Sequence, residues 1–304
     1  MDLEILKIAS DTKNHKVLKD SSHFAKFKNP LCGDEMNVSL MVKGEKITDF
    51  AYECKSCIYC QASASILSKK SITMRTPGND EDLIRGFLFN ERIIENMDEI
   101  DSIKHIGDPV GDYNLHNVIE ATINKTDNLD IGKLKRNFVT NSSCGVCGKT
   151  SLDSIEVLKN DKLDSHFPKI KEEIILKSPS LLMNEQSEFA KTGGIHASAL
   201  IDEAGMVIAT REDVGRHNAL DKLLGHTIQN GLLNIKAQFI ACSGRLNFEL
   251  VQKGLMANIG IMAGVGAPTS LAVDLAKRFD MTLLGFVKES GFNIYNNKNR
   301  ILLS

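Results

Sequence analysis

The sequence predicts an α/β protein in which helices cover a layered sheet, preceded by a smaller α+β segment. From about residue 195, a hairpin is followed by helices and strands in regular alternation, which is typical of a layered domain with a largely parallel sheet. Upstream, residues 37–53 place β-branched and aromatic side chains around Lys43-Gly44, as in a hairpin. Ligands of such an α/β domain bind at the loops that leave the carboxyl ends of the strands.

The individual elements are predicted from local patterns. A short helix is expected over Gln61–Ser68, and the breaker residues Thr76–Asp80 indicate the start of another, whose apolar stripe is Leu83, Phe87, Leu88 and Ile94. The hairpin over Ala199–Arg211 is expected to turn at Glu203-Ala204-Gly205. Helices are then expected at residues 214–230, 245–258 and 268–279, and strands at residues 237–242, 259–263 and 281–287.

Charge and hydropathy exclude some classes of partner. The 304 residues are 42% hydrophobic and 25% charged, with a formal net charge of −2. Nothing in this balance favours binding to nucleic acid or to a membrane surface. The first residues lack the apolar run of a signal peptide, and no segment has the roughly 20 apolar residues of a membrane-spanning helix. A cytoplasmic protein is expected.

Cysteines gather in two groups. Cys144 and Cys147 form one, and Cys54, Cys57 and Cys60 form the other, with Cys32 upstream. Such clusters without a secretion signal indicate metal or thiol chemistry and not a disulfide framework. The seventh cysteine, Cys242, follows an apolar run and is expected to be a buried structural thiol.

The pair Cys144-Gly145-Val146-Cys147 lies among small residues that let another molecule approach closely. Its spacing fits half of a zinc site, a redox dithiol, or a carrier of sulfur or acyl groups. A zinc deaminase is a further possibility, but its signature is absent. No proline precedes Cys144, and Ser198 stands where the glutamate after His196 is required.

Three turns combine glycine with an expected helix start or strand: residues 192–196, 243–245 and 264–270. Free backbone N–H groups at such turns favour anions. No Walker lysine follows, and the GxGxxT of the third turn, with Glu289 downstream, is an incomplete dinucleotide fingerprint. Pro268 is expected in the first turn of its helix.

Residues 211–222 bring cationic groups to the start of another helix. Asp213 is expected to cap it. Arg211, Arg216 and His217 are expected to offer hydrogen-bond donors to an anion at its first turn. Leu220, Leu223 and Leu224 are expected to be its buried face.

Several motifs in order resemble the FdhD/NarQ family of formate dehydrogenase accessory sulfurtransferases, over about residues 70–297. They lie at residues 73–78, 86–88, 143–148, 192–197, 211–218, 243–245 and 267–273. The resemblance implies a cytidine-deaminase-like layered domain with a mixed sheet over residues 70–304, and a cytoplasmic homodimer. It also implies a sulfurtransferase in which Cys144 carries persulfide sulfur and Cys147 assists.

The same resemblance implies the partners and the cofactor. A cysteine desulfurase would donate the sulfur, and a formate dehydrogenase would receive the bis-guanylate molybdopterin cofactor (bis-molybdopterin guanine dinucleotide). The family's cofactor-binding stretch corresponds to Phe286, Val287, Lys288, Glu289, Ser290 and Gly291, with lysine in place of its usual arginine. The cofactor's diphosphates would account for the anion-binding turns, with Thr192, Gly193, Gly194, His196, Arg216, His217, Ser243, Gly244 and Arg245.

Residues 1–69 form a separate cysteine-rich segment, of which about 24–69 resembles the first half of a NifU/IscU-type iron–sulfur scaffold. Cys32 and Cys57 fall on two of the scaffold's cysteine positions, and Asp34 falls on its aspartate. With Cys54 and Cys60 added, four cysteines could hold zinc or an iron–sulfur cluster. The alternative function is a cysteine-ligated zinc or iron–sulfur scaffold without sulfur transfer, in which Cys54, Cys57, Cys144 and Cys147 together hold one metal site.

Overall fold

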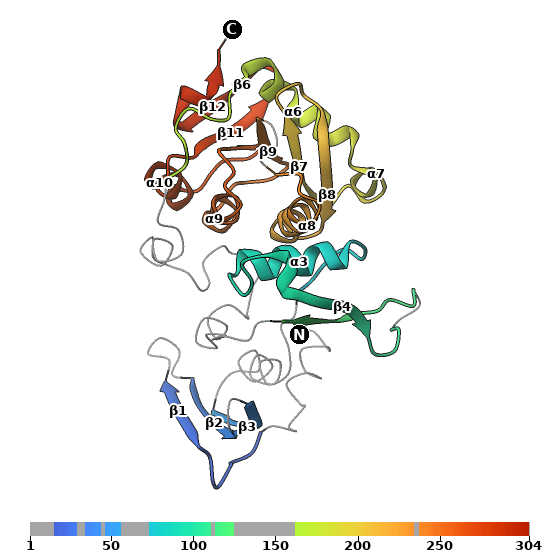
Figure 1. Cartoon of the computed structure of the whole chain (residues 1–304), viewed down its shortest axis with the longest axis vertical. Coiled ribbons are helices and arrows are strands. Elements are labelled where there is room, and N and C mark those ends of the chain that lie inside the picture. Colours follow the sequence, from blue (N-terminus) through green and yellow to red (C-terminus); the bar gives the residue numbers. More distant parts are fainter. Residues whose placement is uncertain are drawn as a thin grey trace. The chain divides into compact units, whose positions relative to one another are not determined.

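The computed structural model describes residues 15–28, 34–43, 46–55, 73–110, 113–124, 162–233 and 237–303. The described residues divide into two compact units, one ending at Thr73 and the other beginning at Met74 (Figure 1).

The N-terminal unit contains a three-stranded antiparallel sheet. Its strands are β1 (His23–Lys28), β2 (Glu35–Lys43) and β3 (Lys46–Lys55), in the order β1-β2-β3. The hairpin expected over residues 37–53 is present, with Val38 opposite Tyr52. Tyr52 and Ala51 are buried and form part of the core of this unit. The helix expected over Gln61–Ser68 lies outside the described residues.

The C-terminal unit is built on a six-stranded mixed sheet in the order β12-β11-β10-β9-β7-β8. Only β9, β10 and β11 run parallel; every other pair in this sheet is antiparallel. The expectation of a largely parallel sheet is therefore wrong outside these three strands, because the β7–β8 hairpin and the tight β11–β12 turn reverse the chain. The bounds are β7 His196–Asp202, β8 Val207–Asp213, β9 Gln238–Cys242, β10 Ile261–Gly264, β11 Thr282–Lys288 and β12 Gly291–Asn296.

Helices cover both faces of this sheet (Figure 1). Alternate residues of each strand point to opposite faces, so Leu200 and Ile240 pack in one core while Ile201 and Phe239 pack in the other. The first core is covered by α8 (Arg216–Gln229), α9 (Phe248–Met256) and α10 (Ser270–Arg278), and the second by α6 (Glu172–Asn184). The predicted leucine face of α8 is confirmed as fully buried.

Side-chain caps decide where two of these helices begin. The side-chain oxygen of Asn247 accepts the N–H of Leu250, and that of Thr269 accepts the N–H of Ala272. Pro268 thus precedes α10 instead of lying in its first turn, which corrects the expectation from sequence.

The helix expected after Thr76–Asp80 is α3 (Asp80–Asn90), with Leu83 and Leu88 buried. Ile94 is also fully buried but lies beyond the end of the helix. The same unit contains the hairpin of β4 (Ile100–Ile106) and β5 (Val118–Ile123), the short parallel pair β6 (Ile170–Lys171) and β13 (Ile301–Leu302), and the short helix α7 (Ser187–Thr192).

Helices α3 and α8 cross at two glycines. A Cβ at Gly225 would lie 2.0 Å from the backbone oxygen of Asp82, and one at Gly86 would lie 1.9 Å from that of Asp221. Both approaches are far inside van der Waals contact, so only glycine allows this crossing.

Gly225→Ala is expected to lower the free energy of unfolding by about 1–3 kcal/mol, because overpacking at the crossing outweighs the better helix propensity of alanine. Urea unfolding followed by circular dichroism measures this change. Gly194→Ala is the matched control, since its Cβ would meet only the oxygen of Thr192, at 3.8 Å. Equal stability of the Gly225→Ala protein and the parent would contradict the close crossing.

Among the described residues, no helix has the length and apolarity needed to cross a membrane.

Candidate functional site

The predicted binding turns converge at one edge of the six-stranded sheet. This edge holds the carboxyl ends of β9, β10 and β11, together with the start of β7 and the start of α8. Ser198 of β7 pairs with Cys242 at the end of β9, which brings His196 level with the turn after β9. Residues from five separate segments of the sequence therefore share one edge.

His196 and the turn after β9 are in direct contact. The hydroxyl oxygen of Ser243 accepts the N–H of Ala197 at 2.9 Å, and the N–H of Ser243 donates to the carbonyl of Ala197 at 3.0 Å. A Cβ at Gly244 would lie 3.1 Å from Nδ1 of His196. Gly244 thus leaves the space in which the imidazole and the neighbouring Arg216 side chain meet.

Arg216 lies near this imidazole, and the charge of Arg245 acts on Arg216. Burial and the positive charge of Arg245 lower the pKa of Arg216, whereas Glu249 raises it. Burial lowers the pKa of His196, and the cations Arg216 and His217 lower it further. The Nε atom of Arg216 is buried and has no hydrogen-bond partner among the described residues. A cationic group in this state is suited to an anion.

Two residues that the sequence did not single out, Asn247 and Glu249, contact the site from α9. His217 Nε2 lies 2.9 Å from Glu249 Oε2 and 2.9 Å from Asn247 Nδ2. Asn247 could have been found as an N-cap, because it directly precedes the amphipathic helix over residues 248–256. Glu249 carries no such signal, since an acidic residue in a first helical turn is ordinary.

The segment after β8 is held by a buried ion pair. Asp213 does not cap α8 as expected; its carboxylate lies 2.7 Å from Nζ of Lys222, and both side chains are at most 1% exposed. The N–H of Thr76 donates to the same carboxylate at 3.0 Å, and Nζ of Lys222 donates to the carbonyl of Thr76 at 2.8 Å. Asn218 joins this network by donating to Asp213 and to the carbonyl of Met74.

Arg211 is not part of the site. Its guanidinium binds the carboxylate of Asp82 on α3, at 2.8 Å from Nη2 and 2.9 Å from Nε. The expectation that Arg211 donates hydrogen bonds to an anion at the start of α8 is wrong, because Arg211 forms an ion pair with a carboxylate that is distant in sequence.

The stretch Phe286–Gly291 lies at the same edge, where β11 extends past β10. Phe286 adopts φ +54°, and its side chain is exposed, while Val287 is buried. The N–H of Phe286 donates to the carbonyl of Gly266 in the turn after β10. Lys288 and Ser290 are exposed, and Glu289 accepts a hydrogen bond from the hydroxyl of Ser180 at 2.8 Å.

The turn before β7 is also exposed. Thr192 ends α7, and Gly193 follows it with φ +65°, a left-handed conformation that suits glycine. Gly194 then leads into β7. The Thr192 hydroxyl donates to the carbonyl of Glu188 at 2.9 Å, and its oxygen accepts the N–H of Gly194 at 3.5 Å.

The cysteine predictions divide by position. Cys144, Cys147, Cys32, Cys57 and Cys60 lie outside the described residues, whereas Cys54 lies near the end of β3 and is partly buried. Cys242 is a buried thiol, as predicted; burial raises its pKa to about 11, against a smaller lowering by the Ser198 hydroxyl. No group of three or more metal-binding side chains occurs within the described ranges.

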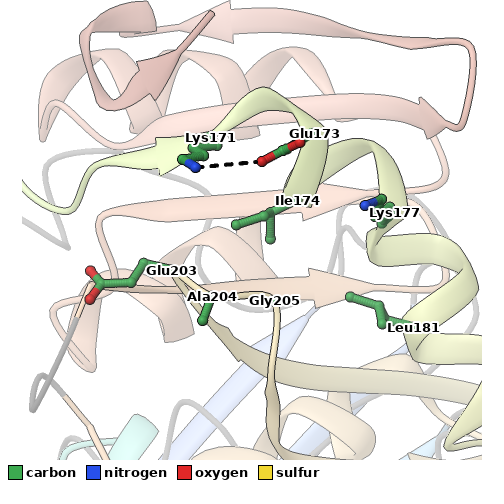
Figure 2. A pocket seen from close by; sticks show the side chains of 8 residues that line it. All are labelled: Lys171, Glu173, Ile174, Lys177, Leu181, Glu203, Ala204 and Gly205. Atoms are coloured by element: carbon green, nitrogen blue, oxygen red, sulfur yellow. Dashed lines mark ion pairs between the residues drawn. The ribbon is translucent and has the colours of Figure 1, made fainter. Parts of the chain in front are cut away.

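A cavity of about 220 Å³ lies between α6 and the β7–β8 turn, at the opposite end of β7 from His196. Figure 2 shows its lining side chains, which include the Lys171–Glu173 ion pair at 3.7 Å. It contains none of the predicted site residues. Its lining is Lys171, Glu173, Ile174, Lys177, Leu181, Glu203, Ala204 and Gly205.

Two family models match the chain, over ranges that overlap at residues 64–83. The sequence model of the FdhD/NarQ family matches residues 64–302, and that of the NifU-like N-terminal domain matches residues 2–83. A protein named sulfur carrier protein FdhD from Streptomyces avermitilis is 42% identical over 235 residues, which cover 77% of this chain and 83% of that protein. Its namesake from Sulfurisphaera tokodaii is 39% identical over 232 residues, covering 76% and 84%.

A solved structure has the same fold. The crystal structure of a formate dehydrogenase accessory protein from Desulfotalea psychrophila is 20% identical and covers 92% of this chain and 98% of its own, with a TM-score of 0.57.

Proposed function

Because this chain belongs to the FdhD/NarQ family, we propose that it is a sulfur carrier that serves a formate dehydrogenase. The observation that carries the proposal is the place of the cysteine pair. Cys144 and Cys147 fall inside the region shared with sulfur carriers of about 40% identity, and the same region supplies the cationic edge of the sheet. The alternative, a metal scaffold without sulfur transfer, does not account for this edge.

The proposed activity is that of a sulfurtransferase. Its first step is thiol–persulfide exchange. The Cys144 thiolate attacks the outer sulfur of a persulfide on a cysteine desulfurase. A new S–S bond forms on Cys144, the S–S bond on the desulfurase breaks, and the desulfurase cysteine leaves as a thiolate, so no external electrons are needed. The reaction requires thiols that are kept reduced, as they are in the cytoplasm.

The proposed acceptor is bis-molybdopterin guanine dinucleotide, bound as a substrate at the carboxyl edge of the sheet. Its diphosphates match the residues there: Arg216 with its unpartnered buried Nε, Arg245, and the glycine turn at Gly244. Phe286–Gly291 would border the same site, where Lys288 offers a point charge and not the bidentate contact of arginine. A homodimer and a cytidine-deaminase-like layering remain part of this proposal.

The N-terminal unit is proposed to hold zinc or an iron–sulfur cluster on Cys32, Cys54, Cys57 and Cys60. The match of residues 2–83 to the NifU-like domain supports this, and Cys54 lies on a strand that ends just before Cys57. Four thiolates suit either group.

Incubation of the full chain with a cysteine desulfurase and cysteine tests the proposed function. Intact mass spectrometry should then show a gain of one sulfur atom, and peptide mapping should place it on the segment that contains Cys144. A protein that gains no sulfur but keeps one metal per chain through Cys144 and Cys147 would be a scaffold, and the carrier proposal would be wrong.

A further inference from the structure

Helix α7 is held by a carboxylate that lies outside the helix. Glu212 of β8 accepts the backbone N–H of Glu188 through Oε2 and that of Phe189 through Oε1, both at 2.9 Å. These are the second and third residues of α7, whose N–H groups have no acceptor within the helix. A side chain at the N-cap position normally accepts one of them. The N-cap residue Gln186 makes no such bond, so Glu212 takes the place of the cap.

The order of α7 depends on this contact. The helix has six residues, whereas a helix needs roughly 12–15 to be stable by itself in water, and none of its side chains is buried. A negative charge at the N-terminus of a helix also interacts favourably with the helix dipole. Glu212 is a firm anchor, because its residue pairs with Ala197 of β7 and its carbonyl lies 3.5 Å from Nζ of Lys222.

The residues that Glu212 binds also hold the turn after α7. The carbonyl of Phe189 accepts the N–H of Gly193 at 2.7 Å, and the carbonyl of Glu188 accepts the hydroxyl of Thr192 at 2.9 Å. This turn is one of the three that the sequence predicts to bind anions. It leads into β7 at the edge of the sheet where the cofactor is proposed to bind.

We propose that Glu212 is a positioning residue of the cofactor site, which caps α7 and thereby holds the turn at residues 192–194 in the conformation that binds a diphosphate. Both carboxylate oxygens of Glu212 are bonded to α7, so it acts through the turn and not by direct contact with the ligand. The inference rests on the cofactor site of the proposed function and names a residue on which the order of that site depends.

Glu212→Gln tests the capping role. The amide oxygen can accept from one N–H, but the amide NH₂ group is a donor and cannot accept from the other. Hydrogen–deuterium exchange in peptides that cover residues 187–194 should become about three- to tenfold faster, as expected for the loss of a helix cap. The buried amides of β9 should stay protected, which shows that the sheet remains folded.

Binding of guanosine diphosphate tests the effect on the site, because this probe carries the guanine and the diphosphate of the proposed cofactor. Its dissociation constant for Glu212→Gln should rise about three- to tenfold, since the turn adopts its binding conformation for a smaller fraction of the time. If Glu212 were only a nearby negative charge, its removal would instead tighten the binding of an anion. Saturating nucleotide should restore part of the protection of residues 187–194, because the ligand and the cap favour the same ordered state.

Glu188→Gln is the matched control. It removes a carboxylate of the same helix that pairs with Lys191 at the surface, and it leaves the cap in place, so exchange and affinity should equal those of the parent. Titration calorimetry on the full chain measures the affinities. Unchanged exchange in Glu212→Gln, or faster exchange with equal or tighter nucleotide binding, would overturn the inference. A parent that does not bind the nucleotide would also overturn it by refuting the cofactor site, whereas the gain of sulfur on Cys144 is measured separately and decides the carrier role by itself.

Discussion

Cys144→Ala is expected to abolish the gain of sulfur when the protein is incubated with a cysteine desulfurase and cysteine. The physical reason is that a thiolate is the attacking group, and alanine removes the atom to which the new S–S bond is made. Formate dehydrogenase activity that depends on this protein should fall to background. Peptide mapping after trapping of persulfides with an alkylating reagent measures the first effect, and assay of the dehydrogenase in cells that contain only the variant measures the second.

Cys242→Ala is the matched control, and Cys147→Ala tests the assisting thiol. Cys242→Ala should gain as much sulfur as the parent does, because the Cys242 thiol is buried and its pKa of about 11 leaves almost no thiolate near neutral pH. Cys147→Ala should still gain sulfur but release it more slowly. In the parent, Cys147 can attack the inner sulfur of Cys144, which expels hydrosulfide and forms a disulfide that a thiol reductant reopens. Sulfur that persists at full level on the Cys144→Ala protein would show that another cysteine is the carrier.

The sequence predicted the edge of the sheet on which the site residues meet. Glycine turns after residues 242 and 264 followed apolar strands, and parallel strands bring their carboxyl ends together, so Ser243, Gly244 and Gly266 could be assigned to one place from the order of residues alone. Arg216 was found in another way, because it falls on the first turn of the helix expected to begin at about residue 214.

The polar partners could not be predicted, because they depend on contacts between distant segments. Arg211 and Arg216 look alike in sequence, yet Arg211 is neutralised by Asp82, 129 residues away, and only Arg216 faces the site. Asp213 looks like a helix cap and is instead the partner of Lys222. Local patterns identify groups that can carry charge, but packing determines which of them remain available to a ligand.

The Asp213–Lys222 pair connects stability to the site. Its network joins Met74 and Thr76 to the start of α8, which presents Arg216 and His217. Lys222→Met is expected to lower the free energy of unfolding by about 3–5 kcal/mol, because a buried carboxylate is left without its cation. Chemical unfolding followed by circular dichroism measures the loss.

A double-mutant cycle tests whether this cost arises from the pair. Adding Asp213→Asn to Lys222→Met should recover part of the lost stability, since the buried negative charge is then removed while the amide side chain at this position can still bond to neighbouring N–H groups. Lys191→Met is the control, because it removes a cation from an ion pair with Glu188 that lies on the surface and should leave stability unchanged. If Lys222→Met were as stable as Lys191→Met, the buried pair would not be what holds the start of α8, and the arrangement of Arg216 and His217 would have to depend on the helix packing alone.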